Sequence, residues 1–199
     1  MQNSDIYKGA INLTNHNGET IEQLSIHWYN KPVVDGYLEL DNIGLKTLEG
    51  GCPKEIQGYF TCTQNKLSNL IGGPEIVSLS YMAGGNPLIS LEGAPLICGE
   101  FYIDNCRQIT SLEGIGKNFI KQCRNLVINN CPITNNILGI FLIKDLNSVF
   151  LNYHHPNNNW YEYPKEIVNI IKQGVSNKTD ILEIQEELIT KGFTSYAKL

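Results

Sequence analysis

The chain has 199 residues, of which 42% are hydrophobic, and this is enough for one domain with a substantial core. Its formal net charge of −5 argues against a general binder of nucleic acids or anionic membranes, because both need a basic surface. The sequence does not open on a basic stretch followed by an apolar one, and no apolar run is as long as a membrane span. We therefore expect a cytoplasmic protein.

Residues 1–35 contain two stretches in which apolar and polar side chains alternate. The apolar positions are Ile11, Leu13, Leu24, Ile26 and Trp28. Such alternation predicts β-strands, and the Asn17-Gly18 pair between the stretches is a turn signal. Because the first unit of a repeat array needs a cover for its core, we predict an N-terminal β cap in this segment.

The middle of the chain, residues 36–150, repeats one pattern with a period of 21 or 22 residues. A leucine is followed two positions later by a glycine, which in turn is followed by Pro or Gly within three residues. The four leucines are Leu48, Leu70, Leu91 and Leu112. Regular self-similarity at such a period indicates a solenoid, in which each unit buries its apolar face against its neighbours.

Each unit is predicted to form a short strand followed by a turn. An apolar-x-apolar pair points alternate side chains into the core, and the third position after it is a slot for a small polar residue. The slot contains Asn65, Asn86, Cys106 and Cys131 in successive copies. An Asn in this slot is suited to bond the turn backbone, so that stacked copies form a ladder. The predicted core contains Leu38, Leu40, Leu45, Phe60, Leu67, Leu88, Phe101, Ile103, Leu126 and Ile128, and a weaker sixth copy begins at Val149.

The cysteines follow the repeat. Cys98 and Cys106 have the same spacing as Cys123 and Cys131, which come 25 residues later. No Cys-x-x-Cys occurs, and a cysteine that recurs with a structural repeat is usually a small buried apolar residue. The pattern favours reduced, metal-free thiols, with a metal site or disulfides as the alternative.

Residues 151–199 end in two predicted helices. The first begins at Pro164, has an apolar face that includes Ile167 and Ile171, and should end at Gly174. The second runs from about Asp180 to Lys191. Its apolar stripe is Ile181, Ile184 and Leu188, and Gly192 should stop it. We expect the two helices to cover the last repeat as a C-terminal helical cap.

No catalytic or metal-binding motif is present. The phosphate-binding loop, the nucleophile elbow and the paired-histidine zinc motif are all missing from the sequence. The His154-His155 pair lies in a polar loop without a carboxylate or cysteine nearby in the sequence, which favours a surface position. We therefore predict a protein that is not an enzyme and has no cofactor, metal or catalytic residue.

Side chains between the inward pairs should point outward from the sheet and form a surface. Tyr and Met with a few carboxylates on one rigid face suit the recognition of another protein. The predicted partner-binding residues are Tyr37, Glu39, Tyr59, Thr61, Met82, Tyr102 and Asp104. The alternative interpretation is that these are merely solvated strand positions.

The repeat resembles that of the leucine-rich-repeat-like proteins of tailed bacteriophages. The resemblance is carried by Tyr59-Phe60-Thr61-Cys62-Thr63-Gln64-Asn65-Lys66-Leu67 and Ser90-Leu91-Glu92-Gly93-Ala94-Pro95, and it extends over residues 36–199. The third repeat departs from the family pattern by lacking the aromatic-x-Cys pair, and the fifth lacks Leu-Glu-Gly. The resemblance implies an α+β fold, a short leucine-rich-repeat-like β-solenoid between the two caps, in a viral or bacterial cytosolic protein.

Together these features predict a non-enzymatic, phage-encoded module that binds a host or viral protein, for example to inhibit a host defence or enzyme. The alternative is a structural or assembly protein of the virion that uses its repeats as a docking surface. Neither nucleic acid nor a membrane is an expected partner, and the oligomeric state stays open.

Overall fold

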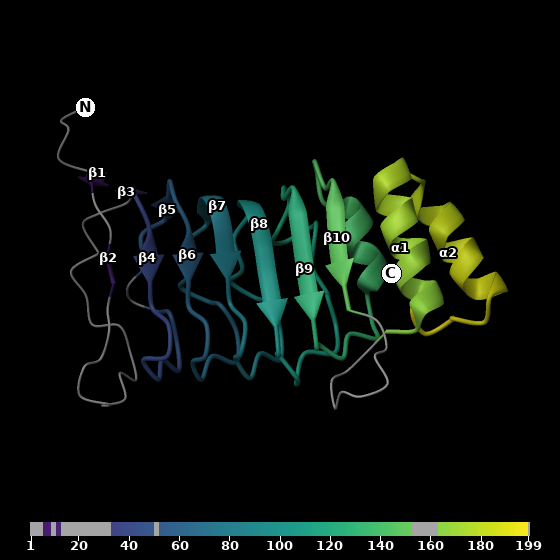
Figure 1. Ribbon diagram of the computed structural model, residues 1–199, viewed down its shortest axis with the longest axis horizontal. Coiled ribbons are helices and arrows are strands. Elements are labelled where there is room, and N and C mark those ends of the chain that lie inside the picture. Colours follow the sequence, from purple (N-terminus) through teal and green to yellow (C-terminus); the bar gives the residue numbers. More distant parts are fainter. Residues whose placement is uncertain (1–5, 9–10, 13–32, 50–51, 153–162, 199) are drawn as a thin grey trace.

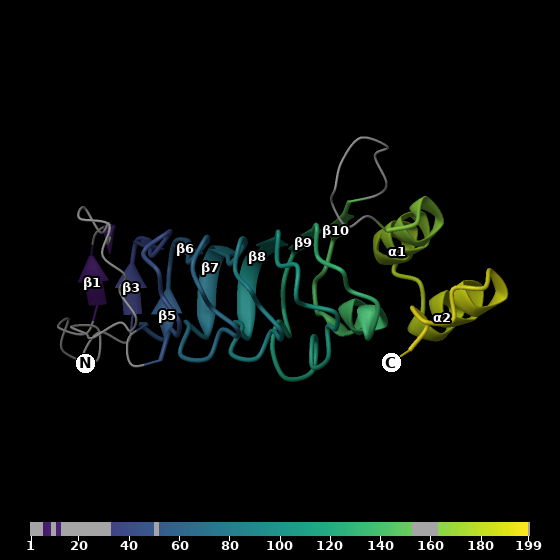
Figure 2. The same ribbon diagram turned by 90° about the horizontal axis from the view of Figure 1, so that it is seen from below.

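A computed structural model of the chain describes residues 6–8, 11–12, 33–49, 52–152 and 163–198. Parallel strands stacked along one axis make up most of the molecule, with helices at one end (Figures 1 and 2). The strands are β1 (Ile6–Lys8), β2 (Ile11–Asn12), β3 (Val33–Asp35), β4 (Leu38–Glu39), β5 (Glu55–Ile56), β6 (Phe60–Thr61), β7 (Ile76–Met82), β8 (Ile97–Asp104), β9 (Asn125–Asn129) and β10 (Ser148–Leu151).

Strand pairing follows the repeat, which confirms the predicted solenoid-like stacking. Each turn of the chain pairs in parallel with the next turn, as when Leu38 of β4 pairs with Phe60 of β6. The first turns have two short strands each, whereas β7 is continuous and pairs with both β5 and β6. At the far end β10 pairs with β9 and places Val149 opposite Leu126, so the weaker sixth copy is also a turn of the stack.

The sheet also extends into the segment that the sequence assigns to an N-terminal β cap. Strands β1 and β2 pair in parallel with β3 and β4. Residues 13–32, which contain the predicted turn and second strand of that segment, lie outside the described residues.

The predicted core residues all lie in one hydrophobic core. Leu38 is 1% exposed, and the other nine predicted core side chains are fully buried. Phe60, Tyr81 and Phe101 occupy the same inward position of successive turns, with ring centroids 4.8 Å and 5.5 Å apart. Stacking therefore buries large aromatic rings that a single turn would leave in water.

The Asn slot forms the predicted ladder between turns. The Asn86 side chain accepts hydrogen bonds from the Asn65 and Leu67 N–H groups, at 3.1 Å and 3.2 Å. It donates to the Cys62 and Ala83 carbonyls, at 2.9 Å and 3.0 Å. Asn65 makes the equivalent bonds one turn earlier. These buried amides satisfy backbone groups where the chain leaves the strand.

The glycine of the Leu-x-Gly motif is required by both backbone angle and close contact. Gly72 and Gly93 have φ of +88° and +83°. A Cβ on Gly93 would lie 2.2 Å from the Ile71 backbone nitrogen. Only glycine combines this left-handed conformation with such close approach to the preceding turn.

Three helical elements follow the main repeats. They are η2 (Ile137–Leu142), a 3₁₀ helix, and the α-helices α1 (Lys165–Asn177) and α2 (Ile181–Thr190). Helix α1 packs against β10, and α2 packs against α1 and η2. The Asp180 side chain caps α2 by accepting a hydrogen bond from the Leu182 N–H at 2.8 Å.

Helix α1 differs from the prediction that Gly174 ends it. The helix continues to Asn177, and the left-handed residue at its end is Lys178, with φ of 54°. Gly174 is buried, and a Cβ there would lie 2.5 Å from Ile184 and 2.9 Å from the Phe141 ring. This glycine therefore allows α1 to pack closely against its neighbours and does not stop the helix.

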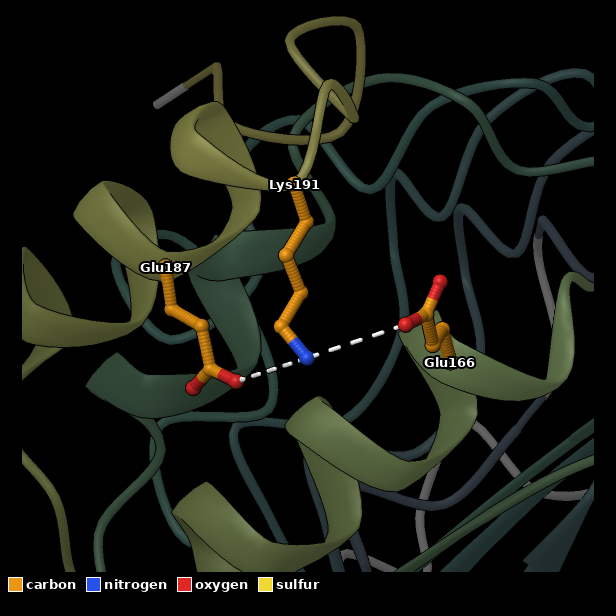
Figure 3. Close-up of polar contacts among 3 residues, drawn as sticks. All are labelled: Glu166, Glu187 and Lys191. Carbon is orange, nitrogen blue, oxygen red and sulfur yellow. Dashed lines mark ion pairs between the residues drawn. The ribbon is translucent and has the colours of Figure 1, made fainter.

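The two α-helices are also joined by ion pairs at the surface (Figure 3). The Lys191 ammonium lies 3.7 Å from a carboxylate oxygen of Glu166 in α1 and 3.5 Å from one of Glu187 in α2. All three side chains are well exposed. Exposed ion pairs of this kind contribute little to stability, about 0–1 kcal/mol.

Candidate functional site

The outward face of the sheet has three columns of side chains that follow the stacked turns. The central column contains Glu39, Thr61, Met82, Tyr102, Val127 and Phe150. One flanking column contains Tyr37, Tyr59, Ser80, Glu100, Asn125 and Ser148, and the other contains Asp41, Thr63, Gly84, Asp104 and Asn129. Parallel pairing thus brings the seven predicted binding residues onto one face.

Two tyrosines form an aromatic stack near the start of this face. The rings of Tyr37 and Tyr59 are 4.7 Å apart between centroids and inclined by only 3°. The Tyr59 hydroxyl donates a hydrogen bond to the Glu39 carboxylate. This bond, with smaller contributions from burial and nearby charges, raises the pKa of Tyr59 to about 12. The phenol is therefore neutral at physiological pH.

Thr61 is the predicted binding residue that a partner cannot readily reach. It is only 4% exposed, because its hydroxyl donates to Asp41 at 2.5 Å. The same Asp41 oxygen accepts from the Thr63 backbone N–H at 2.6 Å and from the Thr63 hydroxyl at 2.9 Å. The accessible polar group at this place is Asp41, which was not among the predicted binding residues.

Glu100 is a second residue that the prediction missed, and its carboxylate, like that of Asp41, accepts three hydrogen bonds. Its carboxylate accepts from the Tyr102 hydroxyl at 2.8 Å, the Asn125 amide at 3.0 Å and the Ser80 hydroxyl at 3.0 Å. These bonds, led by the one from Tyr102, lower the pKa of Glu100. The bond between Tyr102 and Glu100 also raises the pKa of Tyr102. Glu100 and Tyr102 therefore form a pair of a carboxylate and a neutral phenol.

Asp104 lies over a gap in its column. A Cβ on Gly84 would lie 1.7 Å from an Asp104 carboxylate oxygen, so the carboxylate occupies the space that a side chain in the preceding turn would fill. Its other oxygen accepts from the Asn105 amide at 3.2 Å. The absence of a side chain at Gly84 therefore sets the position of Asp104.

The cysteines are packed inside the stack. Five of them are buried and Cys52 is half-buried. In the slots, the Cys106 sulfur lies 3.6 Å from the Ala83 carbonyl and the Cys131 sulfur lies 3.2 Å from the Asn129 carbonyl, which are distances of weak S–H bonds. Burial is also the main cause of the raised pKa of Cys62. The Cys62 thiol is therefore a poor nucleophile.

Metal-ligand clusters and membrane-spanning helices are absent from the described part of the chain. There, no group of three or more His, Cys, Asp or Glu residues is arranged to hold a metal ion. All four histidines, His16, His27, His154 and His155, lie outside the described residues. No helix among the described residues has both the length and the apolar character needed to cross a membrane.

The turn side of the stack carries a shallow cleft of about 770 Å³. Its lining includes the carboxylates of Glu75, Glu92 and Glu113. All three of these side chains are exposed. Ser90 also lines the cleft, and its hydroxyl oxygen accepts a hydrogen bond from the Glu92 backbone N–H at 3.4 Å.

Comparisons with known proteins add no family to this geometry. No protein family, curated protein or solved structure matches the chain. The resemblance to leucine-rich-repeat-like proteins of tailed bacteriophages stays a prediction from the repeat residues.

Proposed function

We propose that the chain is a non-enzymatic protein-binding module whose outward sheet face, over β4 to β8, contacts a host or viral protein. In this proposal the repeats are leucine-rich-repeat-like, residues 1–35 and the C-terminal helices are caps, and the protein acts in the host cytoplasm. Repeat arrays with covered ends use their extended sheet surface in this way.

The observation that carries the proposal is the rigid arrangement of Tyr37, Tyr59 and Tyr102 on one sheet. Their rings or hydroxyl groups are already held by neighbours on the same face, as the Tyr37–Tyr59 stack shows. A partner would therefore gain contact area without the cost of ordering these side chains. Tyrosine is also enriched among the residues that dominate binding energy at protein interfaces.

Affinity capture from a lysate of the host bacterium, followed by mass spectrometry, tests the proposal. The wild-type chain should retain one partner in stoichiometric amount. The double variant Tyr59→Ala/Tyr102→Ala should lose it, because truncating such anchors weakens binding by roughly 2 kcal/mol or more. The melting temperature should change little, since surface substitutions usually alter stability by about 0.5 kcal/mol.

Ile89 and Leu182 provide a matched control away from the sheet face. Both side chains are largely exposed, at 61% and 63%. The variant Ile89→Ala/Leu182→Ala should capture the partner as the wild type does. Capture that survives loss of both tyrosines would refute the proposal, and capture of viral structural proteins would favour a docking role in virion assembly.

A further inference from the structure

The part of the sheet face that carries the tyrosines is acidic. Its carboxylates are Glu39, Asp41, Glu100 and Asp104, on or beside β4 and β8. None of the outward positions in the three columns described above is Lys or Arg. We call Tyr37, Glu39, Asp41, Tyr59, Ser80, Glu100, Tyr102 and Asp104 the acidic face. A surface with one sign of charge selects a partner with the opposite sign.

Hydrogen bonds hold these carboxylates in fixed positions. Glu100 accepts from three side chains, and one oxygen of Asp41 accepts three bonds from Thr61 and Thr63. Glu39 accepts from Tyr59. All these donors are neutral, so the bonds orient the carboxylates without removing their charge. A cationic ligand would meet groups that need no rearrangement.

The tyrosine stack adds an aromatic surface within the acidic face. Tyr37 covers one side of the Tyr59 ring, at a centroid distance of 4.7 Å. The other side is turned toward the next position of the same column, Ser80, whose side chain is too short to cover a ring. The face of an aromatic ring attracts Lys and Arg side chains, and a carboxylate beside it reinforces the attraction.

Two cationic side chains lie toward the β9 and β10 end of the sheet. Lys172 of α1 lies over the Phe150 ring of β10, with its ammonium 4.8 Å from the ring centroid. Arg124, which precedes β9, is close enough to Glu100 to help lower its pKa. A cationic partner segment should therefore lie over β4 to β8 and avoid β10.

We propose that the partner presents a segment rich in Lys or Arg to the acidic face, with one cationic side chain over the Tyr59 ring between Glu39 and Glu100. This inference rests on the proposed function and adds the chemical class of the surface that is recognised.

Fluorescence anisotropy with labelled hexaarginine as the probe tests the inference on the full chain. The wild type should bind hexaarginine but not hexaglutamine. Binding should weaken when the salt concentration rises from about 0.1 M to about 1 M, which shortens the screening length from about 10 Å to about 3 Å. Absence of hexaarginine binding, or equal binding of hexaglutamine, would overturn the inference.

Two triple variants of equal charge locate the binding surface. Glu39→Gln/Glu100→Gln/Asp104→Asn should weaken hexaarginine binding by about tenfold, because several exposed charge interactions are lost together. The control Glu75→Gln/Glu92→Gln/Glu113→Gln removes the same charge from the opposite cleft and should bind within about twofold of the wild type. Equal losses in both would mean that only the net charge attracts the peptide.

A third variant tests the position of the cation. Ser80→Arg places a positive side chain beside the Tyr59 ring and should abolish hexaarginine binding, whereas Ile89→Arg adds the same charge at an exposed position away from the sheet face and should keep it. Unchanged binding by Ser80→Arg would contradict the assigned position. Hexaarginine could fail to bind while capture of the natural partner still requires Tyr59 and Tyr102. In that case the proposed function stands, and only the inference that the partner segment is cationic is refuted.

Discussion

The two halves of the stack have different residues in the slot where the chain leaves each strand. In the turns that contain Asn65 and Asn86, the slot side chain bonds backbone groups of two successive turns, both as donor and as acceptor. In the turns that contain Cys106 and Cys131, the slot side chain makes weak S–H contacts with carbonyl oxygens. The Asn slots thus link successive turns through amide hydrogen bonds to the backbone, which a thiol cannot make.

The Cys half instead adjoins the elements with the most apolar side chains. Ile137, Leu138 and Ile140 of η2 are buried near it, and the Tyr163 hydroxyl donates to the Cys131 carbonyl at 2.8 Å. At this end α1 packs against β10, and α2 packs against α1 and η2. The difference indicates that a solenoid turn can be held by buried amides or by apolar packing, and that the choice depends on what lies beside it.

The largest expected effect comes from removing the helices that pack beside the Cys half. Deleting residues 163–199 removes the buried apolar side chains of α1, including Ile167 and Ile171, and uncovers β10, against which α1 packs. Each fully buried Ile or Val contributes about 1.5–3 kcal/mol, so the loss approaches the whole stability of an ordinary domain, about 5–15 kcal/mol. Size-exclusion chromatography and thermal melting should show aggregation or a large fall in melting temperature.

Hydrogen exchange on the same deletion variant compares the local stability of the two halves. Amides of β9 and β10 should lose protection first, while those of the Asn65 and Asn86 turns keep more of it. A deletion variant that stays monomeric with an unchanged melting temperature would show that the helices are a separate segment and that the Cys half is stable without them.

The next effect in size comes from the slots themselves. Asn86→Ala leaves the Asn65 and Leu67 N–H groups buried without their acceptor, and each such group costs about 1–3 kcal/mol. We expect a loss of about 3–5 kcal/mol in the free energy of unfolding by urea titration. The matched variant Cys106→Ala removes only packing and a weak S–H contact and should cost about 1–2 kcal/mol. Equal losses in the free energy of unfolding of the two variants would contradict the proposed difference between the halves.

The repeat made most of the fold predictable. Spacing alone placed the inward pairs, the Asn ladder and the chain turns at Gly72 and Gly93, because a solenoid forces equivalent residues into equivalent places. Gly174 was misinterpreted because a glycine that ends a helix and a glycine that allows close packing look the same in one sequence. The contacts of Gly174 with Ile184 and Phe141 appear only in three dimensions.

The candidate site was less predictable than the core. Alternation predicts which side chains point outward, and Thr61, Met82 and Tyr102 are register partners in successive strands. It cannot predict that Asp41 covers Thr61, since that contact depends on hydrogen bonds between successive turns. The central place of Glu100 has the same origin, because two of its donors come from neighbouring strands.

The smallest expected effect lies at the surface between the helices. Lys191→Met removes both ion pairs of Figure 3 but keeps most of the aliphatic side chain. The three partners are exposed, so water and salt replace the lost contacts, and the free energy of unfolding should change by less than about 1 kcal/mol. The same measurement on Asn86→Ala should give a loss several times larger, although each side chain contacts two or more partners. Burial, and not the number of polar contacts, would then account for the strength of the Asn half. A loss at Lys191 as large as the loss at Asn86 would contradict that explanation.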